Sequence, residues 1–231
     1  MMGKQETVLV CAAHPDDEIL GCGATMARHA RAGDAVHAII LGRGVSSRGD
    51  DRAASEALEA AARRANAIVG VASLRLFDFP DNRMDTIDRL MIAKCVEEEM
   101  ARVRPSIVYT HHRSDLNVDH GRVADAAAVA ARPLPGASVA SLLFFEVASS
   151  TEWRPAGVAV PFEPNWFVDV SATLEVKLAA LREYAAEMRA FPHPRSLVAV
   201  EHLARWRGAT IGVAAAEAFV TGRHIVAGAV G

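Results

Sequence analysis

Cysteine is scarce in this chain, which has three cysteines among its 231 residues. Cys11, Cys22 and Cys95 cannot all pair with one another, and none belongs to a Cys-x-x-Cys motif. We therefore expect buried or ordinary thiols, which excludes a disulfide-stapled scaffold and a dithiol redox centre. Free thiols also indicate a reducing compartment.

Long apolar runs and an excess of basic residues are missing too. No stretch reaches the ~20 apolar residues of a membrane span, and residues 1–6 are too short and polar for a signal peptide. The net charge of -3 and the pI of about 6.3 provide no basic surface for nucleic acid or for an anionic membrane. We expect a cytoplasmic protein without a membrane span and without nucleic acid as a partner.

What the chain does have is a high apolar content, 51%, and an alternation of strand and helix patterns. Apolar strands joined by helical crossovers are typical of a parallel sheet with helices on both faces. We predict a single Rossmann-like α/β domain over residues 1–231, with a mostly parallel sheet and a helical C-terminal part from about 172 to 231. The predicted strands are 7–12, 36–41, 73–76, 106–110, 141–146 and 166–170, and the predicted helices are 18–32, 52–69, 87–104, 122–132, 172–189 and 196–207.

Four titratable side chains follow the first predicted strand. His14, Asp16, Asp17 and Glu18 stand where this strand would meet the next helix. Ligands of open α/β sheets bind outside the carboxyl ends of the strands, so this position favours a functional site. The alternative is purely structural: Asp16 would cap the helix, Asp17 and Glu18 would complement its dipole, and His14 would be a loop residue.

A second polar cluster, residues 111–120, follows the fourth predicted strand and contains histidines and carboxylates. Because parallel strands present their carboxyl ends at one edge of a sheet, His14, either Asp16 or Asp17, and His120 can converge. Two histidines and one carboxylate are the ligand set of a hydrolytic zinc centre. Such a set also accepts Fe(II), Co(II) or Mn(II).

With these two clusters the sequence resembles the LmbE-like, or PIG-L, family of metal-dependent N-deacetylases. The resemblance rests on Ala-His-Pro-Asp-Asp-Glu at 13–18 and on Asp-Leu-Asn-Val-Asp-His at 115–120. Phe-Pro-Asp at 79–81 and Ala-Glu-Ala-Phe at 216–219 support it. These segments span most of the chain.

The resemblance implies roles for individual residues. His14, Asp17 and His120 would bind Zn²⁺, and Asp16 would be the general base. The implied substrate is an N-acetylated amino sugar, free or attached to a lipid, thiol glycoside, nucleotide or antibiotic. A homo-oligomer is a further expectation that comes from the family alone.

The sequence departs from the family at Asn117, where many members have a histidine that serves the oxyanion or the leaving amine. Some members instead resemble this chain in using a C-terminal histidine, and His193 is the candidate for that role. Asn117 and His111 are candidate contacts of the substrate. Asp119 is expected to orient a histidine, to cap the helix that begins at His120, or both.

Charged residues in two other loops are further candidates. The arginines Arg43, Arg48 and Arg52 follow the second predicted strand and could bind sugar hydroxyls or a phosphate. Loops with serine and arginine are also common on protein surfaces that have no binding function. Asp78, Asp81 and Asp85 could form a second metal site. Because arginines lie nearby in the sequence, we expect surface ion pairs there instead.

Two other classes of function fit parts of the pattern. His14, Asp16 and His120 also match the triad of non-haem Fe(II) oxygenases, but those enzymes are β jelly rolls, whereas this chain alternates strand and helix. A non-catalytic nucleotide-binding module would need a glycine-rich first turn. Gly21-x-Gly23 lacks the third glycine and lies inside a predicted helix, so a metal-dependent hydrolase is the better prediction.

Overall fold

The centre of the molecule is a sheet built by the strands β1 (Thr7–Ala12), β2 (Ala35–Gly42), β3 (Ser73–Phe79), β4 (Ile107–His111), β5 (Ser141–Phe145), β6 (Trp166–Asp169) and β7 (Ala216–His224). The structure, a computed structural model, describes residues 5–44 and 52–226. The strand order is β3-β2-β1-β4-β5-β7-β6. β1 to β5 pair in parallel, whereas β7 is antiparallel to β5 and to β6. The prediction of one α/β domain with a mostly parallel sheet is confirmed.

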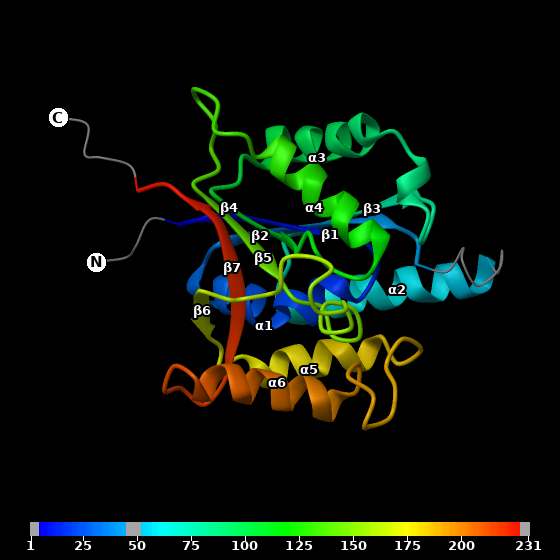
Figure 1. Cartoon of the computed structure of the whole chain (residues 1–231), viewed down its shortest axis with the longest axis vertical. Helices are drawn as coiled ribbons and strands as arrows, with labels where there is room; N and C mark the ends of the chain where they lie inside the picture. Colours follow the sequence, from blue (N-terminus) through cyan, green and yellow to red (C-terminus); the bar gives the residue numbers. More distant parts are fainter. Residues whose placement is uncertain (1–4, 45–51, 227–231) are drawn as a thin grey trace.

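The described helices are α1 (Asp17–Ala32), α2 (Arg52–Val69), α3 (Arg89–Val103), α4 (Val118–Ala130), α5 (Leu174–Glu183), α6 (Leu197–Ala209) and the short 3-10 helix η2 (Met84–Thr86). They cover both faces of the sheet (Figure 1): α3 and α4 pack together on one face, and α1 and α2 lie on the other. There α5 packs against α1 and α2, and α6 contacts β7. Of the helices in the described part of the chain, none has the length and apolar character to cross a membrane.

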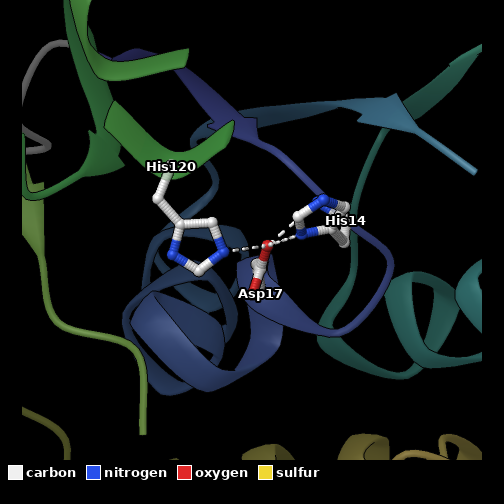
Figure 2. A group of neighbouring side chains, drawn as sticks. All are labelled: His14, Asp17 and His120. Carbon is white, nitrogen blue, oxygen red and sulfur yellow. Dashed lines mark hydrogen bonds and ion pairs between the residues drawn. The ribbon is translucent and has the colours of Figure 1, made fainter. Parts of the chain in front are cut away.

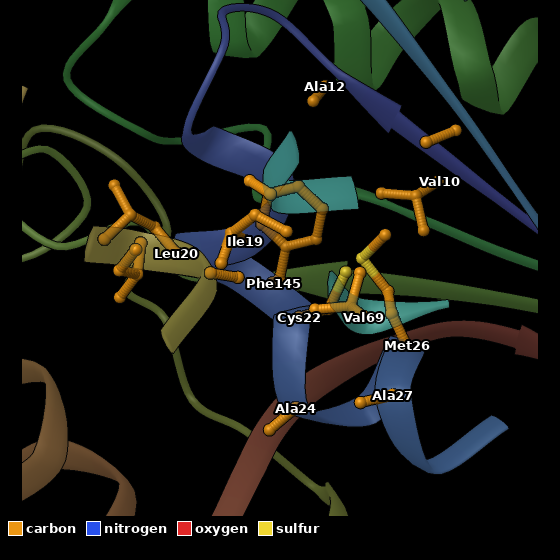
Figure 3. Close-up of a cluster of buried hydrophobic side chains, with 14 of the residues drawn as sticks. Val10, Ala12, Ile19, Leu20, Cys22, Ala24, Met26, Ala27, Val69 and Phe145 are labelled. Atoms are coloured by element: carbon orange, nitrogen blue, oxygen red, sulfur yellow. The ribbon is translucent and has the colours of Figure 1, made fainter. Parts of the chain in front are cut away.

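The side chains of β1 alternate between two hydrophobic cores. Val8, Val10 and Ala12 pack with α1 and α2 in the larger core, part of which is drawn in Figure 3. Leu9 and Cys11 pack with α3 and α4 in the second core. All five side chains are fully buried, because a central parallel strand is covered on both faces. The continuous apolar run that predicted this strand has the same cause.

α1 is interrupted at Cys22, whose φ of -148° and ψ of 23° are not helical. The break exposes new backbone N–H groups, and the carboxylate of Glu217 on β7 accepts hydrogen bonds from those of Ala24 and Thr25 (3.2 and 2.6 Å). Lys177 of α5 donates to the same carboxylate over 2.6 Å in a buried ion pair. The helix that starts in the first polar cluster is therefore tied to the C-terminal part of the fold.

The prediction of a helical C-terminal part is wrong for residues 216–224. This segment is β7, which enters the sheet between β5 and β6. The segment Ala-Glu-Ala-Phe at 216–219 is too short for its pattern to distinguish a helix from a strand, and pairing on both sides decides for the strand. The expected helix over 172–189 is also shorter, since α5 ends at Glu183.

Candidate metal centre and active site

The two polar clusters meet at the carboxyl ends of β1 and β4, which are neighbours in the sheet. Cys11 pairs with Thr110 in the parallel register, so the loops that follow these strands start side by side. The first loop carries His14 and leads to Asp17 at the start of α1, and the second leads to His120 in α4. The structure thus brings together residues that are about a hundred positions apart.

His14, Asp17 and His120 form a buried group whose candidate ligand atoms lie within 4.8 Å of one another. Asp17 Oδ2 is 3.3 Å from His14 Nδ1 and 3.1 Å from His120 Nε2, and both rings turn toward this oxygen (Figure 2). Ligand atoms of a tetrahedral zinc ion with bonds of ~2.0–2.1 Å are about 3.3 Å apart. The donor set and its spacing therefore fit a zinc ion.

Each histidine of this group has a carboxylate at its other ring nitrogen. His14 Nε2 lies 2.9 Å from Asp119 Oδ2, and Asp119 is fixed because it accepts hydrogen bonds from the backbone N–H groups of Asn82 (2.6 Å) and Met84 (2.8 Å). Asp81 Oδ1 also lies 3.1 Å from His14 Nε2. These contacts favour the tautomer of His14 that leaves Nδ1 facing Asp17. The role predicted for Asp119, to orient a histidine, matches this geometry, whereas the helix is capped by Asn117.

Behind His120 lies the carboxylate of Asp115, which forms an ion pair with the ring. His120 Nδ1 lies 3.2 Å from Asp115 Oδ1. The carboxylate of Asp115 accepts hydrogen bonds from the hydroxyls of Ser150 and Thr151 and from the backbone N–H of Asn117. A carboxylate behind each histidine is the usual surrounding of histidines that bind a metal.

The electrostatics of the group favour a cation. Burial alone would lower the pKa of His14, but hydrogen bonds to Asp119 and Asp17 raise it to about 10. Burial likewise opposes the charge on His120, yet the carboxylates of Asp17 and Asp115 raise its pKa to about 9. Both rings are therefore positively charged imidazolium groups in the metal-free protein at neutral pH. A metal ion that displaces these protons can supply the positive charge instead.

Asp16 lies beside the group and lines a cavity of about 160 Å³. It stands at the N-cap position of α1, but its side chain makes no capping hydrogen bond, and its φ of 105° is left-handed. Instead, Asp16 Oδ2 accepts a hydrogen bond of 2.9 Å from Arg195 Nη1. The structural alternative, a simple helix cap, therefore does not describe Asp16. Burial raises the pKa of its carboxyl group well above the ordinary value, against the effect of Arg195.

The cavity is strongly polar. Besides Asp16, its wall includes the metal-site residues His14, Asp17 and His120. The remaining described residues of the lining are Pro15, Gly44, Asp81, Asn82, Asn117, Ser149, Ser150, Glu187 and Arg195. Such a wall offers hydrogen bonds to a substrate that carries hydroxyl and amide groups.

The structure separates the remaining predicted residues. Asn117 lines the cavity, and its Nδ2 donates a hydrogen bond to Asn82. His111 is fully buried and is not among the described lining residues of the cavity. Its ring stacks on that of His120, and its Nε2 accepts a hydrogen bond of 2.8 Å from the backbone N–H of Ala13. This corrects the expectation of a substrate contact, because His111 holds the loop that carries His14.

His193 and Arg52 are also outside the cavity lining. His193 packs edge-on against Trp153, and its Nδ1 accepts a hydrogen bond from the backbone N–H of Arg195. Arg52 is exposed, pairs with Glu56, and lines a separate hollow of about 460 Å³. Arg48 lies outside the described residues. The catalytic role of His193 and the substrate contacts of the two arginines stay predictions.

Several residues of the site escaped the sequence analysis, and three of them contact His14, Asp16 or His120 directly. Asp115 belongs to the second motif but was given no role of its own. Asp81 was expected in a surface ion pair, and it is buried beside His14 instead. Arg195, two positions beyond His193, reaches the cavity and pairs with Asp16. No local pattern marks Arg195, since its partner Asp16 is 179 positions away.

Fold and site together define an α/β protein with a candidate mononuclear metal centre at the carboxyl ends of its parallel strands. Residues 9–131, more than half of the chain, match the family described as PIG-L, GlcNAc-PI de-N-acetylase. The chain belongs to this PIG-L, or LmbE-like, family, and the resemblance seen in the sequence motifs is confirmed.

Individual relatives agree with this assignment. The chain is 33% identical over 187 residues to the uncharacterized deacetylase YaiS of Escherichia coli strain K12. This alignment covers 78% of this chain and 91% of YaiS. The conserved protein TT1542 of Thermus thermophilus has a similar structure, with a TM-score of 0.76 and 26% identity over 98% of this chain and 99% of TT1542. GalB of Pseudomonas putida KT2440, a 4-carboxy-2-hydroxymuconate hydratase, has the same fold with a TM-score of 0.76 and 21% identity over 98% of this chain and all of its own. The fold alone therefore does not define the reaction.

Proposed function

We propose that this protein is a zinc-dependent N-deacetylase that removes the acetyl group from an N-acetylated amino sugar or a sugar conjugate. The observation that carries the proposal is the buried group of His14, Asp17 and His120 beside a cavity lined by a further carboxylate, Asp16. Membership of the PIG-L family and the deacetylase relative support the reaction, and the family description supports an N-acetylglucosamine unit in the substrate.

Each residue of the site has a task in this proposal. His14, Asp17 and His120 would hold the metal, and Asp119 and Asp115 would keep the two imidazoles in the tautomers that present Nδ1 and Nε2. A bound zinc ion would supply a Lewis acid that polarises an amide carbonyl and lowers the pKa of water. Fe²⁺, Co²⁺ and Mn²⁺ suit the same donors.

The chain's own residues would carry out the proton transfers. Asp16 would accept the proton of the attacking water and return it to the leaving nitrogen. Its burial raises its pKa, which suits a group that both accepts and donates a proton. Asn117 would hold the substrate through its side-chain amide, since it lines the cavity next to His120.

Two rival functions lose support. The oxygenase hypothesis required a β jelly roll, and the sheet is mostly parallel and covered by helices on both faces. A nucleotide-binding module would place a pyrophosphate against the first turn, where Asp16 and Asp17 are buried acids. Cytoplasmic location and a homo-oligomer stay predictions.

The test is acetate release from a panel of N-acetylglucosamine conjugates by metal-loaded protein, run beside Asp16→Asn. We expect release by the wild type, its loss on chelation, and a decrease of about 10²–10⁴-fold in Asp16→Asn with the metal still bound. The matched control is Asp85→Asn, which changes an exposed carboxylate of the nearby 3-10 helix η2 that does not line the cavity.

Three results would contradict the proposal. A chelator-resistant activity would remove the metal from the reaction, and full activity of Asp16→Asn would remove the proposed base. Metal-loaded protein that releases acetate from no conjugate, but hydrates an unsaturated acid, would favour the reaction of GalB instead.

A further inference from the structure

We propose that Arg195 is a positioning residue that holds the carboxylate of Asp16 in one orientation for proton transfer. The proposal rests on the proposed function for the role of Asp16 as base. Arg195 lies in the segment between α5 and α6, and its guanidinium reaches the cavity wall. Its Nη1 donates to Asp16 Oδ2 over 2.9 Å.

The carboxylate of Asp16 needs such a partner because the start of α1 does not fix it. The residue has a left-handed backbone with a φ of 105°, which residues other than glycine rarely adopt. Its side chain makes no capping hydrogen bond to α1. Strained conformations of this kind persist only where the surrounding structure holds them, and they cluster at functional sites. The backbone N–H of Asp16 donates to Glu18 Oε2 over 3.1 Å, and the ion pair with Arg195 engages the side chain.

Arg195 is itself held in place from two sides. Its Nε donates to the hydroxyl of Ser149 over 3.1 Å, and its backbone N–H donates to His193 Nδ1 over 3.1 Å. His193 in turn packs against Trp153. The planar guanidinium can therefore bind Ser149 and Asp16 at the same time from one fixed position, which a flexible lysine side chain does less well.

The charges around the cavity also favour the ion pair of Arg195 and Asp16. Asp16, Asp17, Asp81 and Glu187 all line this small volume. Among the lining residues that the structure describes, Arg195 is the one arginine or lysine. By pairing with Oδ2 of Asp16, Arg195 places a positive charge among these carboxylates. We infer that Oδ1 is the oxygen left to exchange a proton with the substrate.

The chain offers a matched control for testing Arg195. Arg207 of α6 pairs with the carboxylate of Glu146 through Nε and Nη2 (2.9 and 2.8 Å). The side chains of Arg195 and Arg207 are 19% and 20% exposed, so both variants to methionine remove a partly buried ion pair of an arginine and a carboxylate. Arg207 does not line the cavity.

The experiment measures kcat, KM, metal content and melting temperature for the metal-loaded full-length wild type, Arg195→Met, Arg195→Lys and Arg207→Met. In Arg195→Met we expect kcat to fall about 100-fold, as misplacement of a reacting group does, while KM and metal content stay within about twofold. Arg195→Lys should recover part of the loss. Arg207→Met should keep its kcat within about twofold, even if its melting temperature falls.

A crystal structure of metal-loaded Arg195→Met, compared with those of the wild type and Arg207→Met, is the second readout. The carboxylate of Asp16 should leave its wild-type orientation only in the Arg195 variant. An unchanged Asp16 in that crystal, or a kcat like that of Arg207→Met, would overturn the proposal. If the wild type releases no acetate at all, the proposed function fails, whereas the orientation of Asp16 in the crystals still decides the role of Arg195.

Discussion

Replacing Asp115 with asparagine should weaken zinc binding about 10–100-fold without removing a ligand, a loss of about 1.4–2.7 kcal/mol. Asp115 is buried and lies 3.2 Å from His120 Nδ1. Burial would raise its pKa, but His120 and the hydroxyls of Ser150 and Thr151 lower it to about 2. The side chain is therefore a carboxylate at neutral pH, and the substitution removes a full charge next to the imidazole.

The shape of the site should survive this substitution. An asparagine in the same place keeps one oxygen to accept the backbone N–H of Asn117, which donates to Asp115 over 2.9 Å. The new amide nitrogen can face Thr151, whose hydroxyl can turn and accept. The retained oxygen is the one that faces His120 Nδ1, so the tautomer of the ring is kept. What is lost is the negative charge that makes His120 a better donor to a metal, so the expected effect is on affinity.

The assay is a competition between the metal-free protein and a chelator of known zinc affinity near neutral pH. Asp125→Asn is the control: it lies in α4 with His120, and it removes a carboxylate that pairs with the exposed Arg113 and does not face the site. Such a surface pair contributes about 0–1 kcal/mol to stability, and zinc affinity should not change. Wild-type affinity in Asp115→Asn, or an equal loss in both variants, would refute the orientation of His120 by Asp115.

Four further predictions concern protons and stability. Zinc binding at neutral pH should release about one proton from each of His14 and His120, and zinc affinity should fall as the pH falls below about 9. Calorimetry in buffers of different ionisation enthalpy measures the number of protons released, and binding without proton release would contradict the prediction. Because these pKa values lie above the ~6.5 of an unfolded histidine, the stability they contribute to the metal-free protein is complete below about pH 6.5 and is lost as the pH rises to about 10, which denaturant unfolding across that range will show or refute. Lys177→Met should lower the free energy of unfolding by about 3 kcal/mol, since it leaves the buried carboxylate of Glu217 without its cation; an unchanged denaturation midpoint would disprove this. Gly21→Ala should cost about 1–3 kcal/mol in the same assay, because a Cβ there would lie 2.3 Å from a buried phenyl ring of β5, and a stabilised variant would show that the ring can move away.

Local sequence was sufficient for much of the fold. The apolar run of β1 predicted a buried strand because a central parallel strand is covered on both faces, and Val8 and Leu9 indeed belong to the two opposite cores. The same approach failed for β7, whose small apolar residues have no strong preference until β5 and β6 pair with them. Segments decided by pairing are hard to assign from one sequence.

For the site, the order of strands and motifs in the sequence was enough to place His14 and Asp17 after one strand and His120 after another, since parallel strands bring their carboxyl ends to one edge. The neighbours that complete the site come from the packing of distant segments. This packing buried His111 behind the cavity and placed Arg195 on Asp16. The spacing of residues in a motif predicts contacts within one loop. The side chains that orient those loops are fixed by packing between distant segments, and no periodicity in the sequence indicates which distant segments will pack together.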